Sequence, residues 1–408
     1  MRRPVPTPRS CRCPCGRGES PYAHAVTPDR AIVAFIALVA AAFSLLIGGC
    51  GSSFPHDTTR VRWMDRHGGA SERPVSLVPG TDSATLISDV IGSTLGCREL
   101  IVSWNADVPD GLGMAVEARV RADQDAAWSP WLFIGEAGRV PFPSPVTSGG
   151  TASVDVDILE STSWFKQAQV RITAFTSPEA SAGGSVVLHR LDVTRTLALG
   201  RGMQGLRRDL TGPPPDWKSL GLPGRVDLGA PFVSQKTPRP ELSGRLCSPA
   251  SVAMAVAWAG REDATVEAIA NAAHDARHDL YGNWPRNVQA AWQYGVPGKV
   301  ARIGSLEDAW RTLASGILIV ASIKADQGQL KGAPYADTQG HLILIRGYDA
   351  EGHFLVSDPA CSTPEAGERV YSRRDMAQVW LLNKRGTCYL FAKPNEASLL
   401  DSGQGAPR

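Results

Sequence analysis

The chain has almost no excess of charge of either sign. Its 42 lysine and arginine residues nearly balance 40 aspartate and glutamate residues, so the formal net charge is +2 over 408 residues. Residues 1–49 hold six arginines against Glu19 and Asp29, a net of +4, and the remaining residues therefore carry −2. Proteins that bind nucleic acid usually concentrate basic residues on one face. We therefore expect no nucleic-acid partner.

Motifs typical of metal sites are also lacking. Three N-terminal cysteines alternate with other residues in a spacing that fits neither a common zinc site nor a redox motif, namely Cys11, Cys13 and Cys15. His274 and His278 are four residues apart and would share one face of a helix predicted over 264–279. In zinc-protease helices a glutamate follows the first histidine, whereas Asp275 stands here. We expect no metal and no other cofactor.

A cysteine directly precedes the most apolar helical stretch of the sequence. Residues 248–259 are nearly all apolar, so a helix here has no solvent-facing stripe and is expected to be central. Pro249 suits the first helical turn, and Gly260 suits the position just past the C-terminus. The partial positive charge of a helix N-terminus stabilises a thiolate. The pattern favours a reactive Cys247, although many free cysteines are buried and inert.

A histidine and an aspartate further along the chain complement this cysteine. The stretch 340–359 is typical of two short strands around an Asp-Ala-Glu-Gly turn. If the turn centres between residues 349 and 350, His341 lies opposite Asp358 in an antiparallel register. A carboxylate at that position would fix the tautomer and orientation of the imidazole, as a catalytic base requires. Without the cysteine, a polar pair at a strand end would be the simpler interpretation.

Taken in order, these motifs resemble those of the C39-like cysteine peptidases, which have the papain-like fold. The resemblance covers roughly residues 226–393 and rests on four segments: 230–235, which ends in Gln235; 247–251, which opens the helix; Gly340-His341; and Asp358-Pro359. It implies that Cys247 is the nucleophile, His341 the base and Asp358 the orienting group. It also implies that the Gln235 side chain donates a hydrogen bond to the oxyanion, beside the Cys247 backbone N–H.

Two features differ from the family pattern. Ser248 follows the cysteine where many relatives have glycine. Eleven residues separate Gln235 from Cys247, which leaves the placement of the glutamine open. The loops 236–246 and 324–339 are the segments expected to determine substrate specificity.

The N-terminal stretch is typical of an exported protein. Residues 31–47 form a continuous apolar run like the hydrophobic region of a signal peptide. Residues 47–50 resemble a bacterial lipobox, which implies cleavage before Cys50 and lipidation of this residue. A single membrane-spanning anchor is the alternative. Residues 1–25 lack apolar periodicity and are interpreted as an over-extended start. We expect a lipoprotein anchored to a bacterial membrane on its periplasmic or cell-surface side.

The rest of the chain divides by composition and periodicity. Apolar and polar residues alternate in several short stretches of 98–196, which predicts an antiparallel β-sandwich. Its expected role is accessory, with a glycan or cell-wall polymer as ligand, and Trp128 and Trp131 form either a ligand platform or an aromatic core. The predicted fold class is α+β, with these parts: leader 1–49 (26–49 the signal peptide), tether and irregular segment 50–97, β-sandwich 98–196, linker 197–225, papain-like peptidase domain 226–396 and disordered tail 397–408.

Two cysteines of the peptidase region remain without a role. Disulfides are permitted in an exported protein, so we hypothesise a bridge between Cys361 and Cys388. The sequence as a whole predicts an exported, lipid-anchored cysteine peptidase that hydrolyses amide bonds of peptides or proteins through a thioester. A peptidoglycan amidohydrolase or an acyl or amide transferase with the same triad is one alternative. A non-catalytic surface binding protein is the other.

Overall fold

The computed structural model describes residues 56–61, 63–64, 70–71, 73–81, 84–177, 184–197 and 209–401. The predicted signal peptide and the predicted lipidation site Cys50 lie outside these residues. Within the described ranges, no helix is long and apolar enough to cross a membrane. The residues from Gly51 onward form one compact unit.

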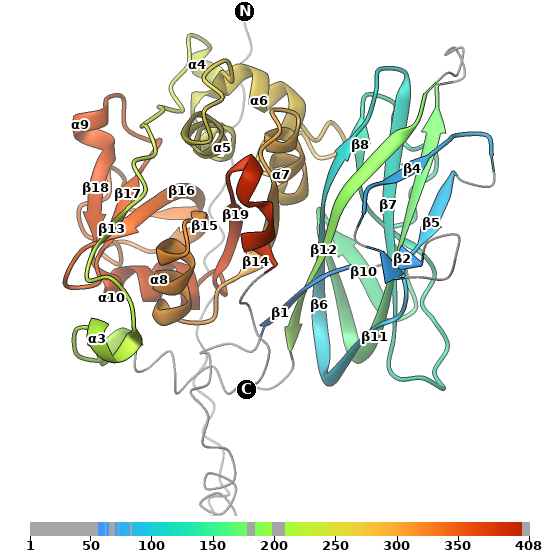
Figure 1. Cartoon of the computed structure of the whole chain (residues 1–408), viewed down its shortest axis with the longest axis horizontal. Helices are drawn as coiled ribbons and strands as arrows, with labels where there is room; N and C mark the ends of the chain where they lie inside the picture. The colour runs from blue at the N-terminus through green and yellow to red at the C-terminus, as the bar shows by residue number, and fades with distance from the viewer. Residues whose placement is uncertain are drawn as a thin grey trace, which may run out of the picture. The chain divides into compact units, whose positions relative to one another are not determined.

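The N-terminal part of this unit is built from strands (Figure 1). Their bounds are β1 His56–Arg60, β2 Trp63–Met64, β3 Ala70–Ser71, β4 Val75–Leu77, β5 Thr85–Ile87, β6 Ile91–Asp107, β7 Leu112–Arg121, β8 Leu132–Gly138, β9 Ser148–Gly149, β10 Ala152–Asp155, β11 Ile158–Thr176 and β12 Val186–Leu197. All strand pairs in this part are antiparallel. The alternation seen in the sequence supplies its apolar core, which includes Met114, Val116, Val170 and Ile172. The predicted β-rich domain is therefore confirmed.

Two long strands connect this sheet. Strand β6 pairs with β11 through its first half and with β12 through its second, while β11 continues from β6 onto β7. Strands β1 and β4 add to β12, and β5 adds to β11. The segment 50–97, predicted as a tether and irregular segment, thus contributes strands to the sheet. Strands of three to five residues are too short for alternation to identify them.

The two tryptophans of the β region contact arginine side chains. The Arg119 guanidinium lies 4.7 Å from the Trp128 ring centroid and 4.4 Å from that of Trp131. Arg121 lies 4.4 Å from the Trp128 ring, and Arg171 lies 4.7 Å from the Trp131 ring. Each ring is half-buried and contacts two cations, an attractive arrangement for an indole. The rings therefore pack against arginine side chains and are not part of the buried apolar core.

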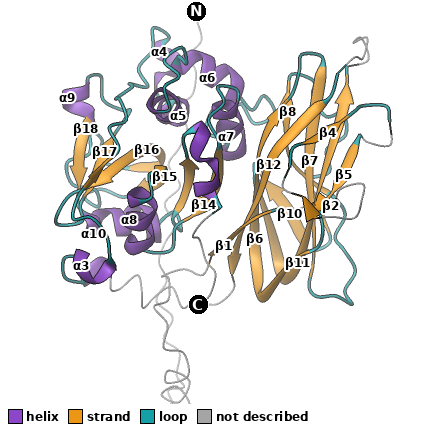
Figure 2. Cartoon of the chain, in the orientation of Figure 1, coloured by secondary structure: helices purple, strands orange, loops and turns teal. Residues whose placement is uncertain are grey.

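The C-terminal part combines a sheet with helices on both of its faces (Figure 2). Its strands are β13 Val226–Asp227, β14 Gly298–Arg302, β15 Leu318–Ala325, β16 Thr338–Tyr348, β17 Phe354–Ser357, β18 Glu368–Tyr371 and β19 Thr387–Phe391. Its helices are α3 Trp217–Leu220, α4 Pro240–Ser243, α5 Cys247–Trp258, α6 Val266–Ala273, α7 Trp284–Trp292, α8 Leu306–Ala314, α9 Pro364–Gly367, α10 Arg373–Met376, the π-helix η1 Ala377–Leu382 and the 3-10 helix η2 Pro394–Leu400. The strand order is β14-β19-β15-β16-β17-β18, with β13 on β16.

The central strands β15 and β16 separate two apolar cores. Leu342 and Leu344 of β16 pack with α5, α6 and α7, whereas Ile343 and Ile345 pack on the opposite face with α8 and η1. Because successive side chains of a strand point to opposite faces, a continuous apolar run is what a sheet covered on both sides requires. This is the α+β arrangement expected for a papain-like domain.

The β region also completes the core of the C-terminal part. Ile101 and Ile158 pack into the apolar cluster that surrounds α5. The buried Gln289 side chain on α7 accepts from the Ala106 N–H at 2.9 Å and donates to the Ala106 carbonyl at 2.7 Å. Asp157, between β10 and β11, accepts from the backbone N–H of Trp284 at 2.6 Å. The two regions therefore share a polar and apolar interface.

The helix predicted over 264–279 is shorter than expected. Helix α6 ends at Ala273, so His274 and His278 do not share a helix face. The Asp275 carboxylate accepts from the backbone N–H groups of Arg277 at 3.0 Å and His278 at 3.4 Å. Such local side-chain bonds compete with helical hydrogen bonds, which explains why the helix does not continue.

The predicted disordered tail 397–408 is partly ordered. Helix η2 runs to Leu400, whose side chain is buried, and Lys299 donates to the Leu400 carbonyl at 2.5 Å. Asp401 pairs with Arg190 of the β region at 2.7 Å. These contacts join groups that lie far from each other in the sequence. The local composition of the segment therefore could not predict that it is ordered.

The hypothesised Cys361–Cys388 disulfide is not formed, because both residues are free thiols. Cys388 lies on β19, and Cys361 follows β17, with β15 and β16 between those two strands. Neighbouring strands are about 4.8 Å apart, so three strand spacings exceed the distance that a disulfide spans. The prediction of a bridge was therefore wrong.

Candidate active site

Helix α5 places Cys247 at its first residue, as predicted. The cysteine is partly exposed, whereas the next nine residues of the helix are buried. Gly260 follows the helix with a φ of +82°, a conformation that favours glycine, and its N–H donates to the Ala257 carbonyl at 2.9 Å. The nucleophile candidate therefore stands at the exposed end of an otherwise buried helix.

Two serines attach this helix to the sheet. The Ser251 hydroxyl donates to the carbonyl of Leu342, the residue after His341, at 3.2 Å. The Ser248 hydroxyl lies 2.9 Å from the Tyr389 hydroxyl. Ser248, which differs from the glycine of many relatives, thus has a buried hydrogen-bond partner. These bonds fix the position of α5 relative to the strand that carries the histidine.

The structure brings His341 and Asp358 together. His341 lies on β16 and Asp358 directly follows β17, with 2.8 Å between Nε2 of the ring and Oδ1 of the carboxylate. The register differs from the predicted one, because Leu344 pairs with Ser357. This is a shift of two residues, which leaves side chains on the same face of the sheet. The predicted contact is therefore present although the assumed pairing was wrong.

The Cys247 thiol and the His341 ring shift each other's titration. Burial of the thiol opposes ionisation, but its hydrogen bond with His341 and the positive charge of that ring hold the pKa of Cys247 below its ordinary value. Burial likewise opposes protonation of His341, but its bonds to Asp358 and Cys247 raise the pKa of His341 to about 10. These opposite directions are those expected of a thiolate–imidazolium pair.

Asp358 is fully buried and accepts four hydrogen bonds. Besides His341, the Ala360 N–H donates to Oδ1 at 3.1 Å. The hydroxyls of Tyr335 and Tyr371 donate to Oδ2 at 3.0 Å and 2.8 Å. Burial opposes ionisation, but these bonds and the charge of His341 lower the pKa of Asp358. Neither tyrosine was predicted from the sequence, because nothing in their spacing distinguishes them from ordinary core tyrosines.

Gln235 lies between two segments that flank the triad. Its backbone N–H donates to the carbonyl of Pro359 at 2.9 Å. Its side-chain Nε2 donates to the carbonyl of Ser243 at 2.6 Å, and the buried Oε1 has no hydrogen-bond partner. One of the two hydrogens of the amide is thus bound by the loop that leads to Cys247. The second hydrogen remains for another acceptor.

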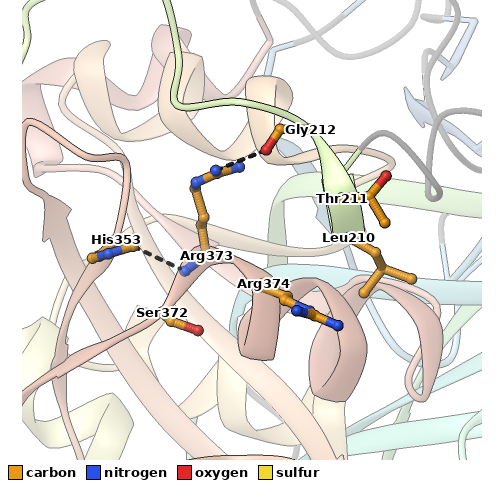
Figure 3. Close-up of a pocket in the computed structure, with 7 residues that line it drawn as sticks. All are labelled: Leu210, Thr211, Gly212, His353, Ser372, Arg373 and Arg374. Atoms are coloured by element: carbon orange, nitrogen blue, oxygen red, sulfur yellow. Dashed lines mark hydrogen bonds between the residues drawn. The ribbon is translucent and has the colours of Figure 1, made fainter.

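His274 and His278 bond to different aspartates, at 3.2 Å to Asp279 and 3.0 Å to Asp275. Within the part of the chain that the structure describes, no group of three or more histidine, cysteine or acidic residues is arranged to hold a metal ion. A cavity of about 350 Å³ lies elsewhere (Figure 3), lined by Leu210, Thr211, Gly212, His353, Ser372, Arg373 and Arg374. No residue of the triad lines this cavity.

Comparison with solved structures gives only weak similarity. A chain from the "Structure of infectious bursal disease virus Gt strain" is 11% identical, with a TM-score of 0.21, over 37% of this chain and 34% of that chain. A chain of the Gx strain is 13% identical, also with a TM-score of 0.21, over 38% of this chain and 35% of that chain. The chain thus spans about a third of the length of these viral chains. No curated protein matches it.

Family comparison is more informative. Residues 227–388 match the Peptidase_C39 like family, and residues 54–193 match the Peptidase C39 N-terminal domain. The first match contains the candidate nucleophile, base and carboxylate, and the second contains most of the β region. The resemblance found in the sequence is therefore confirmed: residues 227–388 match a C39-like peptidase domain, and the region before it matches the N-terminal domain of such peptidases.

Proposed function

We propose that this protein is an active cysteine peptidase that uses Cys247, His341 and Asp358 as its triad. The observation that carries the proposal is the chain of interactions from the thiol to the imidazole and on to a fully buried carboxylate. The nucleophile needs a proton acceptor, and the imidazole needs a group that fixes its orientation. The arrangement supplies each of these with a separate side chain.

The reaction follows from this geometry. The Cys247 thiolate attacks the carbonyl carbon of an amide and forms a tetrahedral adduct whose oxygen carries the negative charge. The adduct collapses to a thioester as the C–N bond breaks, and His341 transfers its proton to the leaving amine. Water then attacks the thioester and gives its proton to His341. The products are the acid and the regenerated thiolate–imidazolium pair.

The charge on the carbonyl oxygen requires fixed donors. Cys247 is the first residue of α5, and the N–H groups at the start of a helix have no partner within it. Gln235 is the proposed second donor through the Nε2 hydrogen that does not face Ser243. Donors that are held in place before the reaction stabilise the developing charge more than they stabilise the substrate.

The finer parts of the function are also proposals. The lipobox-like stretch supports export, with a lipid anchor at Cys50 on the periplasmic or cell-surface side of a bacterial membrane. The substrate class that suits a thioester mechanism is a peptide or protein. The same triad would serve a peptidoglycan amidohydrolase or an acyl or amide transferase. The ligand proposed for the β region is a glycan or cell-wall polymer.

Alkylation tests the triad without a known substrate. The purified protein is treated with iodoacetamide from pH 4 to 10, and modification of each cysteine is followed by mass spectrometry. We expect Cys247 to react well below the pH at which an ordinary thiol, with a pKa of about 8.5, ionises. Substitution His341→Ala should abolish that reactivity at low pH. Cys388 is the internal control, because burial raises its pKa and should leave it unmodified.

A second assay tests peptide hydrolysis. A fluorogenic peptide library is incubated with the protein and with Cys247→Ala, which should eliminate cleavage. If Cys247 reacts as an ordinary thiol, the triad does not operate. The binding-protein alternative would then take its place.

A further inference from the structure

Two tyrosines from different segments converge on one oxygen of the candidate catalytic aspartate. Tyr335 belongs to the loop before β16, and Tyr371 ends β18. Both hydroxyls donate to Oδ2 of Asp358, while Oδ1 accepts from His341 and from the Ala360 N–H. The two oxygens of the carboxylate thus have separate tasks, one toward the imidazole and one toward the phenols.

We propose that Tyr335 and Tyr371 are positioning residues of the triad, which hold the Asp358 carboxylate through Oδ2 so that Oδ1 stays ionised and directed at His341. The inference rests on the proposed function, because it assigns how the orienting group of that triad is itself oriented. Neither tyrosine is a catalytic residue, since both act through Asp358.

The need for such donors follows from burial. A fully buried carboxyl group without enough donors takes up a proton instead of keeping its charge. The terminal χ2 torsion of an aspartate has a broad preference, so the carboxylate can rotate when nothing holds it. Hydrogen bonds at both oxygens restrict this rotation. Hydrogen bonds to an ionised acceptor are also roughly twice as strong as neutral ones. Two phenols at Oδ2 therefore stabilise both the charge and the orientation that the imidazole requires.

The phenols are suited to donate because they keep their protons. Burial and the nearby charge of Asp358 raise the pKa of both Tyr335 and Tyr371, so both keep their protons. Other ionisable groups near this cluster include His341 from β16, with Cys247 of α5 beyond it, and Arg369 from β18, which contacts the Cys361 thiol. The Arg369 side chain donates to Cys361 Sγ at 3.4 Å and to the Gly332 carbonyl.

Tyr335 adds a second restraint on the base. Its ring meets the His341 ring edge to face, with 5.0 Å between the ring centroids and 73° between the planes. The surrounding loop is attached to the domain by the Lys331 N–H, which donates to Asp375 Oδ2 at 3.2 Å, and by the Arg369 bond to Gly332. Tyr335 thus contacts both partners of the histidine–aspartate pair from one side.

The test uses three variants: Tyr335→Phe, Tyr371→Phe and the double variant that combines these two substitutions. Each of them is compared with a control variant, Tyr348→Phe. Tyr348 is a matched control, because it is also buried and its hydroxyl donates to a backbone carbonyl, that of Pro223, at 2.9 Å. The readouts are the pH dependence of Cys247 alkylation by iodoacetamide and the absorbance of the thiolate near 240 nm. Thermal unfolding is measured on each variant in parallel.

Loss of one bond to a charged group changes the ionisation constant of Asp358 by about tenfold and loosens the carboxylate that orients His341. Part of this change reaches Cys247 through His341, so each single substitution should lower the alkylation rate at pH 6 by about threefold or more. The double variant should show a larger loss. Tyr348→Phe should lower the unfolding temperature without moving the pH profile.

The outcomes separate the inference from the function on which it rests. If Cys247 of the unmodified protein has the profile of an ordinary thiol, the proposed function fails. If that profile is shifted to low pH but Tyr335→Phe and Tyr371→Phe both behave like Tyr348→Phe, the inference is overturned and the function stands. If Tyr371→Phe does not fold, Tyr335→Phe is sufficient for the test, because Tyr335 is only half-buried.

Discussion

Two buried aspartates, Asp358 beside the candidate nucleophile and Asp157 beside helix α7, have the same side chain in different surroundings. Both are at most 5% exposed. Asp358 accepts from a protonated ring, two phenols and a backbone N–H, and its pKa is lowered. Burial raises the pKa of Asp157 to about 7, and the nearby charge of Asp275 adds to the effect, which the bond from the Trp284 N–H only partly offsets.

The difference indicates that donors and neighbouring charges, and not depth alone, decide whether a buried carboxyl group is ionised. Burial disfavours the charge at both sites, and each hydrogen bond to the ionised form favours it. At Asp358 the donors outweigh burial, which suits a group that has to stabilise an imidazolium ion. At Asp157, where the β region meets α7, they do not, and the interface therefore contains a group that titrates near neutral pH.

The largest expected effect comes from removing the charge of Asp358. In Asp358→Asn a neutral amide replaces the carboxylate, so the imidazolium loses its partner and Cys247 loses its thiolate. We expect alkylation of Cys247 at pH 6 to slow by about 10- to 100-fold, because an ordinary thiol is less than about 1% ionised there. Asp157→Asn is the matched control and should leave this rate unchanged. Equal slowing in both variants would contradict the distinction between the two sites.

Asp157→Asn should instead change how stability depends on pH. The pKa of Asp157 is raised in the folded protein above the value of about 3.9 in an unfolded chain. The folded state therefore binds the proton more tightly, and stability falls as pH rises between those two values. From pH 5 to pH 8 this linkage amounts to about 2.6 kcal/mol for one group.

An asparagine at position 157 can still accept from Trp284 but does not titrate. Urea unfolding at several pH values should therefore give a flatter stability profile for Asp157→Asn than for the unmodified protein. Asp358→Asn should change the profile in the opposite sense, because Asp358 stabilises the fold above its unfolded pKa and this stability is lost as pH falls. Parallel profiles for all three proteins would show that neither carboxyl group is linked to folding.

The sequence allowed the chemistry of the triad to be predicted better than its geometry. Cys247 before an apolar run, with His341 and Asp358 on neighbouring strands, follows from residue type and local order. The pairing was wrong because the turn lies further along the chain than expected: Tyr348 pairs with Phe354, a shift of three residues, and the irregularity between Ile345 and Gly347 reduces the shift to two. The His341–Asp358 contact is present nevertheless, because a shift of two residues leaves each side chain on the same face of the sheet.

Groups that act through long-range contacts were not predictable in this way. Tyr335 and Tyr371 reach Asp358 from 23 and 13 residues away, and no periodicity marks a phenol that donates to a carboxylate. Asp157 reaches Trp284 across 127 residues. The prediction of a Cys361–Cys388 bridge was wrong for the same reason. Whether two cysteines can form a disulfide depends on the number of strands that separate them in the sheet, and membership in one domain does not reveal that number.

The smallest expected effect comes from a substitution at the interface between the β region and α7. Gln289 on α7 makes two buried hydrogen bonds with the Ala106 backbone, and Gln289→Ala would leave that N–H and carbonyl without partners. We expect a loss of stability of about 2 kcal/mol in urea unfolding, with no change in the pH profile of Cys247 alkylation. Gln293→Ala, at the exposed C-terminal end of the same helix, should change stability by less than about 0.5 kcal/mol. If Gln289→Ala shifted the alkylation profile as Asp358→Asn does, the interface and the triad would be coupled, and the two aspartates would belong to one system.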